Sequence, residues 1–186
     1  MKKWPLISFT SAALLVIAAV FFLGFDPKQS LLQGDVLSSS PDYFLTDVQV
    51  KVYNQDGTMV ERIKASELKH YSKSAKSLLL NPKIERDESP NHWSAKGDNG
   101  IIADGSQDIL LTGNSEVIRN IDTIDQINLT ANQIHYNDSN QQLTSTGKAT
   151  LQTKQGITSA DTIIAHIHTE TVSMTGRVRG TYETNQ

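Results

Sequence analysis

The sequence contains no cysteine and few aromatic residues, so two common sources of stability in extracellular domains are missing or scarce. Cysteine is absent from all 186 residues, and aromatic residues make up only 6% of them. Without cysteine the chain can form no disulfide and has no thiol that could carry a lipoprotein acyl group. The fold must therefore hold together by packing alone.

Sequence patterns of common catalytic sites are also missing. The chain has no Gly-x-Ser-x-Gly elbow, no His-Glu-x-x-His pair and no cysteine nucleophile. His166 and His168 would share one face of a strand, but two ligands are too few for zinc, which usually takes about four. We therefore expect no enzymatic activity, no cofactor and no metal site.

Basic residues are too few and too scattered for a nucleic-acid partner. The chain has 17 Lys and Arg against 20 Asp and Glu, and without Lys2 and Lys3 the 15 remaining basic residues leave residues 26–186 with a formal charge of −5. Nucleic-acid binders cluster their basic residues and place aromatic residues between them. We therefore exclude nucleic acid as a partner.

One long hydrophobic run is present, from Trp4 to Phe25. Its 22 residues carry no charge and follow two lysines. A membrane-spanning helix needs about 20 apolar residues, and flanking lysines stay on the cytoplasmic side. A cleavable signal peptide is the alternative, but it needs small residues at the cleavage site, where this sequence reads FFLGFDP. We therefore expect residues 1–25 to form a cytoplasmic tip and an uncleaved transmembrane helix.

The chain after this run divides into a tether and one domain. Residues 26–41 are rich in turn formers and predict a periplasmic tether, and residues 42–186 predict a periplasmic domain. Valines alternate with polar residues over 48–52, which is typical of a strand buried on one face. The turn-forming residues 54–57 then predict a hairpin whose second strand covers about 59–65.

Beyond this hairpin the sequence repeats with a period of about 30 residues. The first landmark of the repeat is an alanine followed by a polar residue, at Ala65, Ala95, Ala131 and Ala160. The second landmark, which we expect to close each unit, falls at Asn81, Gly113, Gly147 and Gly176. Each unit predicts two strands joined by a turn, as in 127–136 and 143–151. Because one hairpin cannot bury its apolar face alone, the units should stack into an all-β domain.

Several short motifs occur in a suggestive order along the chain. They are Pro41-Asp42-Tyr43, Val52-Tyr53-Asn54-Gln55-Asp56-Gly57, Arg62, Ala65, His70-Tyr71, Trp93-Ser94-Ala95, Gly113 and Gly147. Together with the N-terminal anchor, this order resembles the LptC family of the lipopolysaccharide export system, whose domain also occurs in LptA and at the start of LptD. The resemblance implies a partly open β-jellyroll, or β-taco, of stacked antiparallel strands with an apolar interior, preceded by one transmembrane α-helix.

The resemblance also implies a function. A protein of this kind is a single-pass inner-membrane protein that accepts lipopolysaccharide from an LptB/LptF/LptG-like ABC transporter and passes it to an LptA-like periplasmic carrier. By the same resemblance the N-terminal edge, near 43–52, would meet the transporter. The C-terminal edge, near 172–182, would accept the carrier by strand addition. The alternative for both segments is an ordinary edge strand blunted by charge.

Period-two apolar positions are the candidates to line a lipid-binding trough. They are Val48, Val50, Val52, Ile63, Leu79, Leu111, Val117, Leu129, Leu151, Ile163, Val172 and Tyr182. Because each exposed acyl CH₂ costs about 0.8 kcal/mol, such a trough must shield a lipid continuously. The alternative is a closed core, which would make the protein a membrane-anchored adaptor without a lipid ligand. An enzyme acting on envelope glycans would need clustered carboxylates or aromatic residues, which the sequence does not offer.

The candidates for partner docking are Tyr43, Gly147, Met174, Arg177 and Val178. Gly147 stands where a strand twists or where another backbone approaches closely, and a plain bulge glycine is the alternative. If the glycine serves docking, replacing it by arginine should disrupt binding of LptA near the C-terminal edge.

Overall fold

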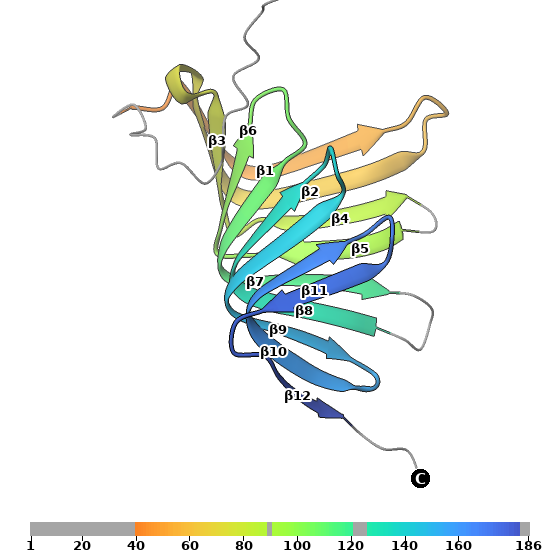
Figure 1. The fold of residues 1–186 in the computed structure, drawn as a ribbon. Helices are drawn as coiled ribbons and strands as arrows, with labels where there is room; N and C mark the ends of the chain where they lie inside the picture. Colours follow the sequence, from red (N-terminus) through yellow and green to blue (C-terminus); the bar gives the residue numbers. More distant parts are fainter. Residues whose placement is uncertain (1–39, 89–90, 121–125, 183–186) are drawn as a thin grey trace, which may run out of the picture. The chain divides into compact units, whose positions relative to one another are not determined.

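The computed structural model describes residues 40–88, 91–120 and 126–182. These residues form twelve antiparallel strands in the order β11-β10-β9-β8-β7-β5-β4-β2-β3-β6, with β1 paired to β2 and β12 paired to β10 (Figure 1). The strands are β1 Tyr43–Tyr53, β2 Met59–Tyr71, β3 Lys76–Leu80, β4 Lys83–Glu88, β5 Asn91–Lys96, β6 Asn99–Ala103, β7 Ile109–Asn120, β8 Gln126–Asn137, β9 Gln142–Thr153, β10 Gly156–His166, β11 Thr171–Thr175 and β12 Arg179–Tyr182. The predicted stack of antiparallel strands is confirmed.

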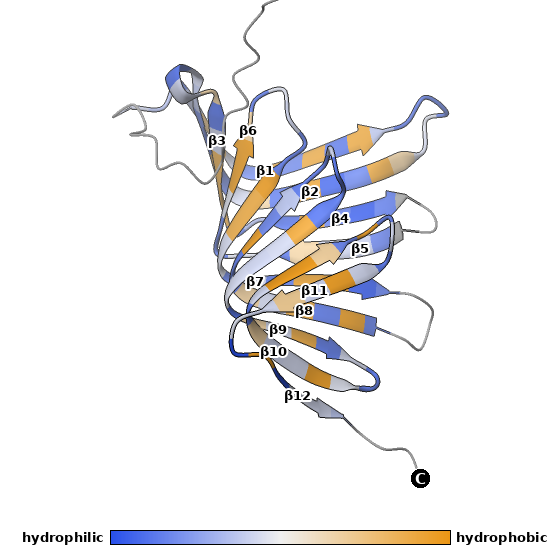
Figure 2. Cartoon of the chain, in the orientation of Figure 1, coloured by the Kyte–Doolittle hydropathy of each residue, from blue (hydrophilic) through white to orange (hydrophobic). Residues whose placement is uncertain are grey.

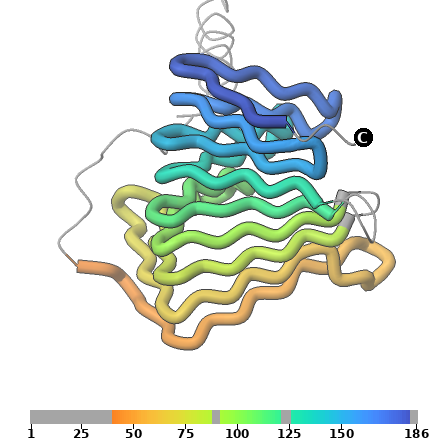
Figure 3. Tube along the Cα trace, turned by 90° about the horizontal axis from the view of Figure 1, so that it is seen from below, coloured from red at the N-terminus to blue at the C-terminus, as the bar shows by residue number. Residues whose placement is uncertain are grey.

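The long strands bend once, and the sheet therefore folds into two layers that face each other (Figure 3). In β2, residues 67–71 pair with β3, whereas residues 61–64 pair with β4. Layer A contains β3, β6 and β11, and layer B contains β4, β5 and β12. Strands β1, β2 and β7 to β10 contribute one segment to each layer. We call the line of bends the crease, and the opposite side, where the layers end in turns, the mouth.

Glycines in the left-handed conformation form three of the bends. Gly113, Gly147 and Gly176 have φ of +72°, +77° and +70°, and each is followed by a second residue with positive φ. A Cβ at these glycines would lie 2.5, 2.9 and 2.5 Å, respectively, from side-chain atoms of Asp98, Asn132 and Asp161. Only a residue without Cβ fits both the backbone and this contact.

The two landmarks of the sequence repeat meet at the crease. Asn132 and Asp161 follow the alanines of the first landmark and contact the glycines of the second. The expectation that the second landmark closes each hairpin unit is therefore wrong, because these glycines lie in the middle of strands or directly after one. They mark where a strand changes layer, and the register between neighbouring strands shifts there.

The core lies between the two layers. Ile84 and Trp93 of layer B are buried together with Ile134 and Tyr136 of layer A. Hydrophobic and hydrophilic residues alternate along most strands, so each layer offers one apolar face (Figure 2). Burying a large apolar side chain contributes about 1.5–3 kcal/mol, which is how a chain without disulfides stabilises this fold.

The first hairpin follows the prediction at its start and exceeds it at its end. The side-chain oxygen of Asn54 accepts hydrogen bonds from the backbone N–H groups of Asp56 and Thr58, at 3.0 and 2.9 Å. The second strand runs from Met59 to Tyr71 rather than to residue 65, because beyond the crease it continues in layer A beside β3. A single 3₁₀ turn, Ser72–Ser74, follows it.

The predicted anchor, residues 1–25, lies outside the described residues, as does most of the predicted tether, residues 26–41. Within the part of the chain that the structure describes, no helix has the length and hydrophobicity needed to cross a membrane.

Candidate functional site

The interior-facing side of both layers, here called the inward face, carries continuous rows of mostly apolar side chains. Residues paired directly across neighbouring strands lie on the same face, so the register defines the rows. The row of layer A is Leu45, Leu68, Leu79, Gly100, Leu111, Ile134, Ser145, Ile163 and Met174. The row of layer B is Val50, Ile63, Ile84, Ala95, Val117, Leu129, Leu151, Thr158 and Gly180. Both rows extend from β1 to the last strand of their layer.

The residues that the sequence predicts to line the trough all lie on the inward face. Most belong to the two rows, namely Leu79, Leu111 and Ile163 in layer A and Val50, Ile63, Val117, Leu129 and Leu151 in layer B. Val48 lies one position nearer the crease, and Val52, Val172 and Tyr182 lie one position nearer the mouth. Period-two alternation is a local property, which is why the sequence alone could assign this face. Their contact with a lipid stays a prediction.

Burial along the inward face is highest in the middle and falls toward both ends. Leu111 and Leu129 are 3% exposed, whereas Val50 near the first edge is 40% exposed. At the other end, Val172 is 44% and Tyr182 is 71% exposed. The apolar surface therefore reaches solvent at the two ends of the sheet.

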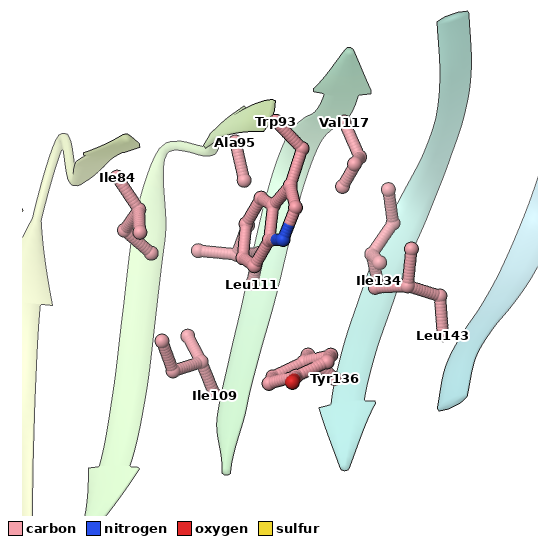
Figure 4. A pocket seen from close by; sticks show the side chains of 9 residues that line it. All are labelled: Ile84, Trp93, Ala95, Ile109, Leu111, Val117, Ile134, Tyr136 and Leu143. Carbon is pink, nitrogen blue, oxygen red and sulfur yellow. The ribbon is translucent and has the colours of Figure 1, made fainter. Parts of the chain in front are cut away.

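The middle of the interior is filled by side chains. It leaves a cavity of about 10 Å³, and Figure 4 shows the side chains that line it. These are Ile84, Trp93, Ala95, Ile109, Leu111, Val117, Ile134, Tyr136 and Leu143. A void of this size holds about one water molecule. In this conformation the middle of the interior has no room for an acyl chain.

Two buried serines interrupt the apolar interior. Ser145 in the row of layer A is 0% exposed and Ser115 next to the crease is 1% exposed, and neither hydroxyl has a hydrogen-bond partner. A buried hydroxyl without a partner costs about 1–3 kcal/mol of desolvation free energy. These two positions therefore lower the stability of the interior.

Replacing Ser145 by alanine should raise the free energy of unfolding by about 1 kcal/mol, because the substitution removes the unpaired hydroxyl and leaves only a small void. Urea unfolding of the two proteins checks this. Replacing the exposed Ser173 by alanine is the control and should change stability little. A Ser145→Ala protein less stable than the parent would show that the hydroxyl has a partner.

A cluster of polar and aromatic side chains joins the two layers at the mouth. It consists of Glu61, Arg86 and Trp93 from layer B and Gln107, Tyr136 and Asp138 from layer A, and we call it the clasp. The guanidinium of Arg86 donates to Glu61 at 2.8 Å within its own layer, and to the Tyr136 hydroxyl at 3.0 Å across the mouth. It lies 5.4 Å from the ring centre of Trp93 and 5.2 Å from that of Tyr136.

The remaining contacts of the clasp complete the connection between the layers. Arg86 also donates to Asp138 and Gln107, both at 3.4 Å, and the rings of Trp93 and Tyr136 lie 5.6 Å apart. The Tyr136 hydroxyl donates to Asp138 at 2.9 Å. Cation–π contacts and charge-assisted hydrogen bonds therefore act on the same side chain.

Burial shapes the electrostatics of the clasp. Burial would lower the pKa of Arg86, but the attraction of Glu61 and the hydrogen bond to it outweigh burial and raise that pKa. Burial, followed by the hydrogen bond to Asp138, raises the pKa of Tyr136 to about 12. The arginine is thus charged and the tyrosine is neutral at any physiological pH.

The sequence analysis did not single out the clasp. A signal was present, because Glu61 and Arg86 fall in phase with the apolar residues Ile63 and Ile84 on the same strands. A charged residue in the apolar phase of a strand indicates a paired, buried ion. The pairing with Tyr136, fifty positions further along the chain, carries no local signal.

The predicted N-terminal edge is an edge strand in the structure. Among the described strands, β1 pairs only with β2. The ring of Tyr43 stacks on His70 with 4.8 Å between ring centres, and Phe44 is 65% exposed. An unpaired strand with exposed apolar side chains is a template for strand addition. The docking role of Tyr43 stays a prediction.

The predicted C-terminal edge is also made of edge strands, because β11 and β12 each pair with β10 and with no other described strand. Met174 ends the row of layer A, and Val178 is exposed between the two strands. The guanidinium of Arg177 donates to Asp161 at 2.9 and 2.7 Å, and this hydrogen bonding lowers the pKa of the carboxyl group. Docking at these residues stays a prediction.

Gly147 lies in the interior of the sheet, at the crease of β9 between β8 and β10. It belongs to neither edge, although β10 beside it carries both strands of the C-terminal edge. A direct contact of Gly147 with a partner stays a prediction, and the structure adds a local reason for the glycine in its φ and its contact with Asn132.

Metal ligands do not gather in the described part of the chain, where no group of three or more His, Asp or Glu side chains could hold an ion. His166 ends β10, and His168 lies in the turn that follows it, so the two do not share one strand. The expectation that they share a strand face is wrong, because the chain turns at residue 167 toward β11.

Comparison with solved structures gives the class of fold. The chain is similar to the crystal structure of LptH, the LptA-homologous periplasmic component of the conserved lipopolysaccharide transport device from Pseudomonas aeruginosa, with a TM-score of 0.59. The match has 8% sequence identity and covers 67% of this chain and 95% of that chain. A likeness at such low identity establishes the fold alone, which is the LptA-like β-jellyroll.

Comparison with protein families is more specific. The model of the family described as lipopolysaccharide-assembly, LptC-related, matches residues 11–183. The chain belongs to this family, as its resemblance indicated, and LptC- and LptA-like proteins are lipopolysaccharide transport proteins, not enzymes. No curated protein sequence matches the chain closely.

Proposed function

We propose that this protein is the membrane-anchored periplasmic component of the lipopolysaccharide transport bridge. It accepts lipopolysaccharide from an LptB/LptF/LptG-like ABC transporter in the inner membrane and passes it to an LptA-like carrier. Its N-terminus lies in the cytoplasm, residues 1–25 anchor it, residues 26–41 form the tether, and the β-domain lies in the periplasm. The family and the fold support this proposal.

The observation that carries the proposal is the continuity of the inward face. Apolar rows extend from the first strand to the last in both layers and reach solvent at each end, near Val52 and Val172. An acyl chain moving along this face stays shielded, which matters because each exposed CH₂ costs about 0.8 kcal/mol. A passive surface sets no direction of transfer, so the free energy comes from the ATPase of the transporter.

Photo-crosslinking tests the lipid ligand. A photoreactive amino acid at Leu79 or Val172, both on the inward face, should capture lipopolysaccharide in cells. Leu80 and Ser173 are the matched controls, because each is the next residue on the same strand, points outward and is exposed. Adducts at the outward positions equal to those at the inward ones would contradict a trough on this face.

Co-purification tests the partners. The tagged full-length chain, extracted from membranes, should bring down an ABC transporter, and a photoreactive residue in β1 should crosslink to it. A residue in β12 should instead crosslink to the carrier, because an unpaired edge accepts a further strand. Recovery of the chain without any transporter would contradict the proposed place in the bridge.

One observation favours a second function. The filled middle of the interior, with its cavity of about 10 Å³, is what a membrane-anchored adaptor with a closed core and no lipid ligand would have. The crosslinking experiment decides between the two. Lipid adducts at neither Leu79 nor Val172, in a protein that still recovers its partners, would establish the adaptor.

A further inference from the structure

The contrast between the open ends and the filled middle of the inward face requires an explanation if a lipid passes along it. The cavity beneath the clasp holds about one water molecule, whereas Val50 and Val172 at the two ends are exposed. Resting on the proposed function, a lipid that moves between the ends must separate the layers in the middle. The contacts that hold the layers together there are those of the clasp.

We propose that the clasp is a gate, which opens the mouth when an acyl chain enters between the layers and closes behind it. Its moving contact joins Arg86 of layer B to Tyr136 and Asp138 of layer A. The ligand class is an amphiphile whose acyl chains lie on the inward face and whose polar headgroup stays at the mouth.

The hydrogen bonds of the clasp divide cleanly between the layers, which makes opening possible. If the layers part, Arg86 keeps its ion pair with Glu61, because β2 and β4 are neighbours in layer B. Tyr136 keeps its hydrogen bond to Asp138, because both belong to the end of β8 and the turn after it. Opening therefore leaves no buried charge without a partner, which would be the most unfavourable outcome.

The bonds lost on opening are few and weak. They are the hydrogen bonds from Arg86 to Tyr136 at 3.0 Å, to Asp138 at 3.4 Å and to Gln107 at 3.4 Å, together with the aromatic contact. Gln107 and Asp138 lie in a loop and a turn at the rim of layer A, where water replaces the lost partner. The apolar side chains exposed by opening meet the entering acyl chain instead of water.

A second ion pair crosses the mouth one strand further on and provides an internal control. Arg119 of layer B donates to Glu170 of layer A at 2.8 Å, but the side chain of Glu170 is 70% exposed. Exposed ion pairs contribute little, so this pair should not hold the gate. The clasp, with Arg86 and Glu61 side chains only 10% and 11% exposed, is the tighter contact.

Distance measurements between spin labels test the gate in the full-length chain reconstituted in lipid nanodiscs. Because the chain has no cysteine, labels at Asn140→Cys and Gln155→Cys are unique. Both positions are exposed turn residues at opposite ends of β9, one at the rim of each layer. Adding lipid A should lengthen and broaden the distance distribution. The doubly substituted protein Tyr136→Phe/Asp138→Asn should show the longer distances without lipid.

Three controls keep the result interpretable. Tyr53→Phe removes a phenol hydroxyl, Asp161→Asn a carboxylate and Glu170→Gln the exposed cross-mouth pair, and none should change the distances. Circular dichroism verifies that the gate variant is folded. The adduct yield at Val172 should rise several-fold in the gate variant.

The outcomes separate this gate from the proposed function. Unchanged distances in a protein that captures lipid at Val172, or a gate variant with the distances and adduct yield of its parent, would overturn the gate and leave the transport role standing. A parent protein that captures no lipid at any inward position would overturn the proposed function, and the gate with it.

Discussion

Replacing Ile163 by alanine should lower the free energy of unfolding by about 4 kcal/mol. Ile163 is 0% exposed and lies in the row of layer A between Ser145 and Met174. The substitution loses the transfer free energy of the removed methyl and methylene groups and leaves a cavity in a layer whose backbone is fixed by strands on both sides. Urea unfolding followed by circular dichroism measures the loss.

Ile157→Ala is the matched control, because it is the same substitution in the same strand at a residue that is 46% exposed. It should cost less than about 1 kcal/mol. The difference between the two variants isolates burial from strand propensity. A cost below about 1 kcal/mol for Ile163→Ala would mean that the two layers do not pack on each other at this row, and that the inward face is open along its whole length.

The local part of this architecture could be predicted from the sequence. Alternation of apolar and polar residues assigned the inward face, because a strand places every second side chain on one side. The turns at Asn54–Gly57 and 137–140 were also predicted, since their residue types favour turns at any place in a fold. The start of the domain at Tyr43 and the stacking of hairpins follow from the same local patterns.

The crease was missed because two readings of a glycine in a strand look alike. The repeat of Gly113, Gly147 and Gly176 was visible, but a glycine that ends a hairpin and one that bends a strand have the same local sequence. The partners Asp98 and Asn132 decide between the two readings, and they lie on the preceding strands. Their contact depends on the register of the whole sheet.

The clasp was missed for a related reason. Glu61 and Arg86 are brought together by the pairing of β2 with β4, which the sequence could suggest. Tyr136 reaches them only because the sheet folds back on itself, so that β8 of layer A faces β4 of layer B. Which residues meet across two layers is a property of the bend, and the bend depends on the crease.

The crease also gives rise to the second large effect. Replacing Gly147 by arginine should lower the free energy of unfolding by about 3 kcal/mol or more. A residue with Cβ at φ of +77° costs about 1–2 kcal/mol, and the Cβ would in addition lie 2.9 Å from the side-chain nitrogen of Asn132. Thermal unfolding of parent and variant measures the sum.

Gly105→Arg is the control that separates the two contributions, because Gly105 has φ of +69° and no atom within 4 Å of its Cβ position. It should cost about 1–2 kcal/mol, which is the backbone contribution alone. A second substitution, Asn132→Gly, removes the contacting side chain and should restore part of the stability of Gly147→Arg. Equal costs for the two glycine variants would show that Asn132 yields without strain.

The same variant should also weaken binding of an LptA-like carrier, although Gly147 lies on neither edge. Strand β9 pairs with β10, and β10 carries both β11 and β12, so a displaced crease changes the edge to which the carrier is proposed to add. A pull-down with the carrier should show the loss for Gly147→Arg and its partial recovery with Asn132→Gly. Full binding by a variant that has lost stability would mean that the edge tolerates the distortion, whereas lost binding without lost stability would favour direct contact of residue 147 with the partner.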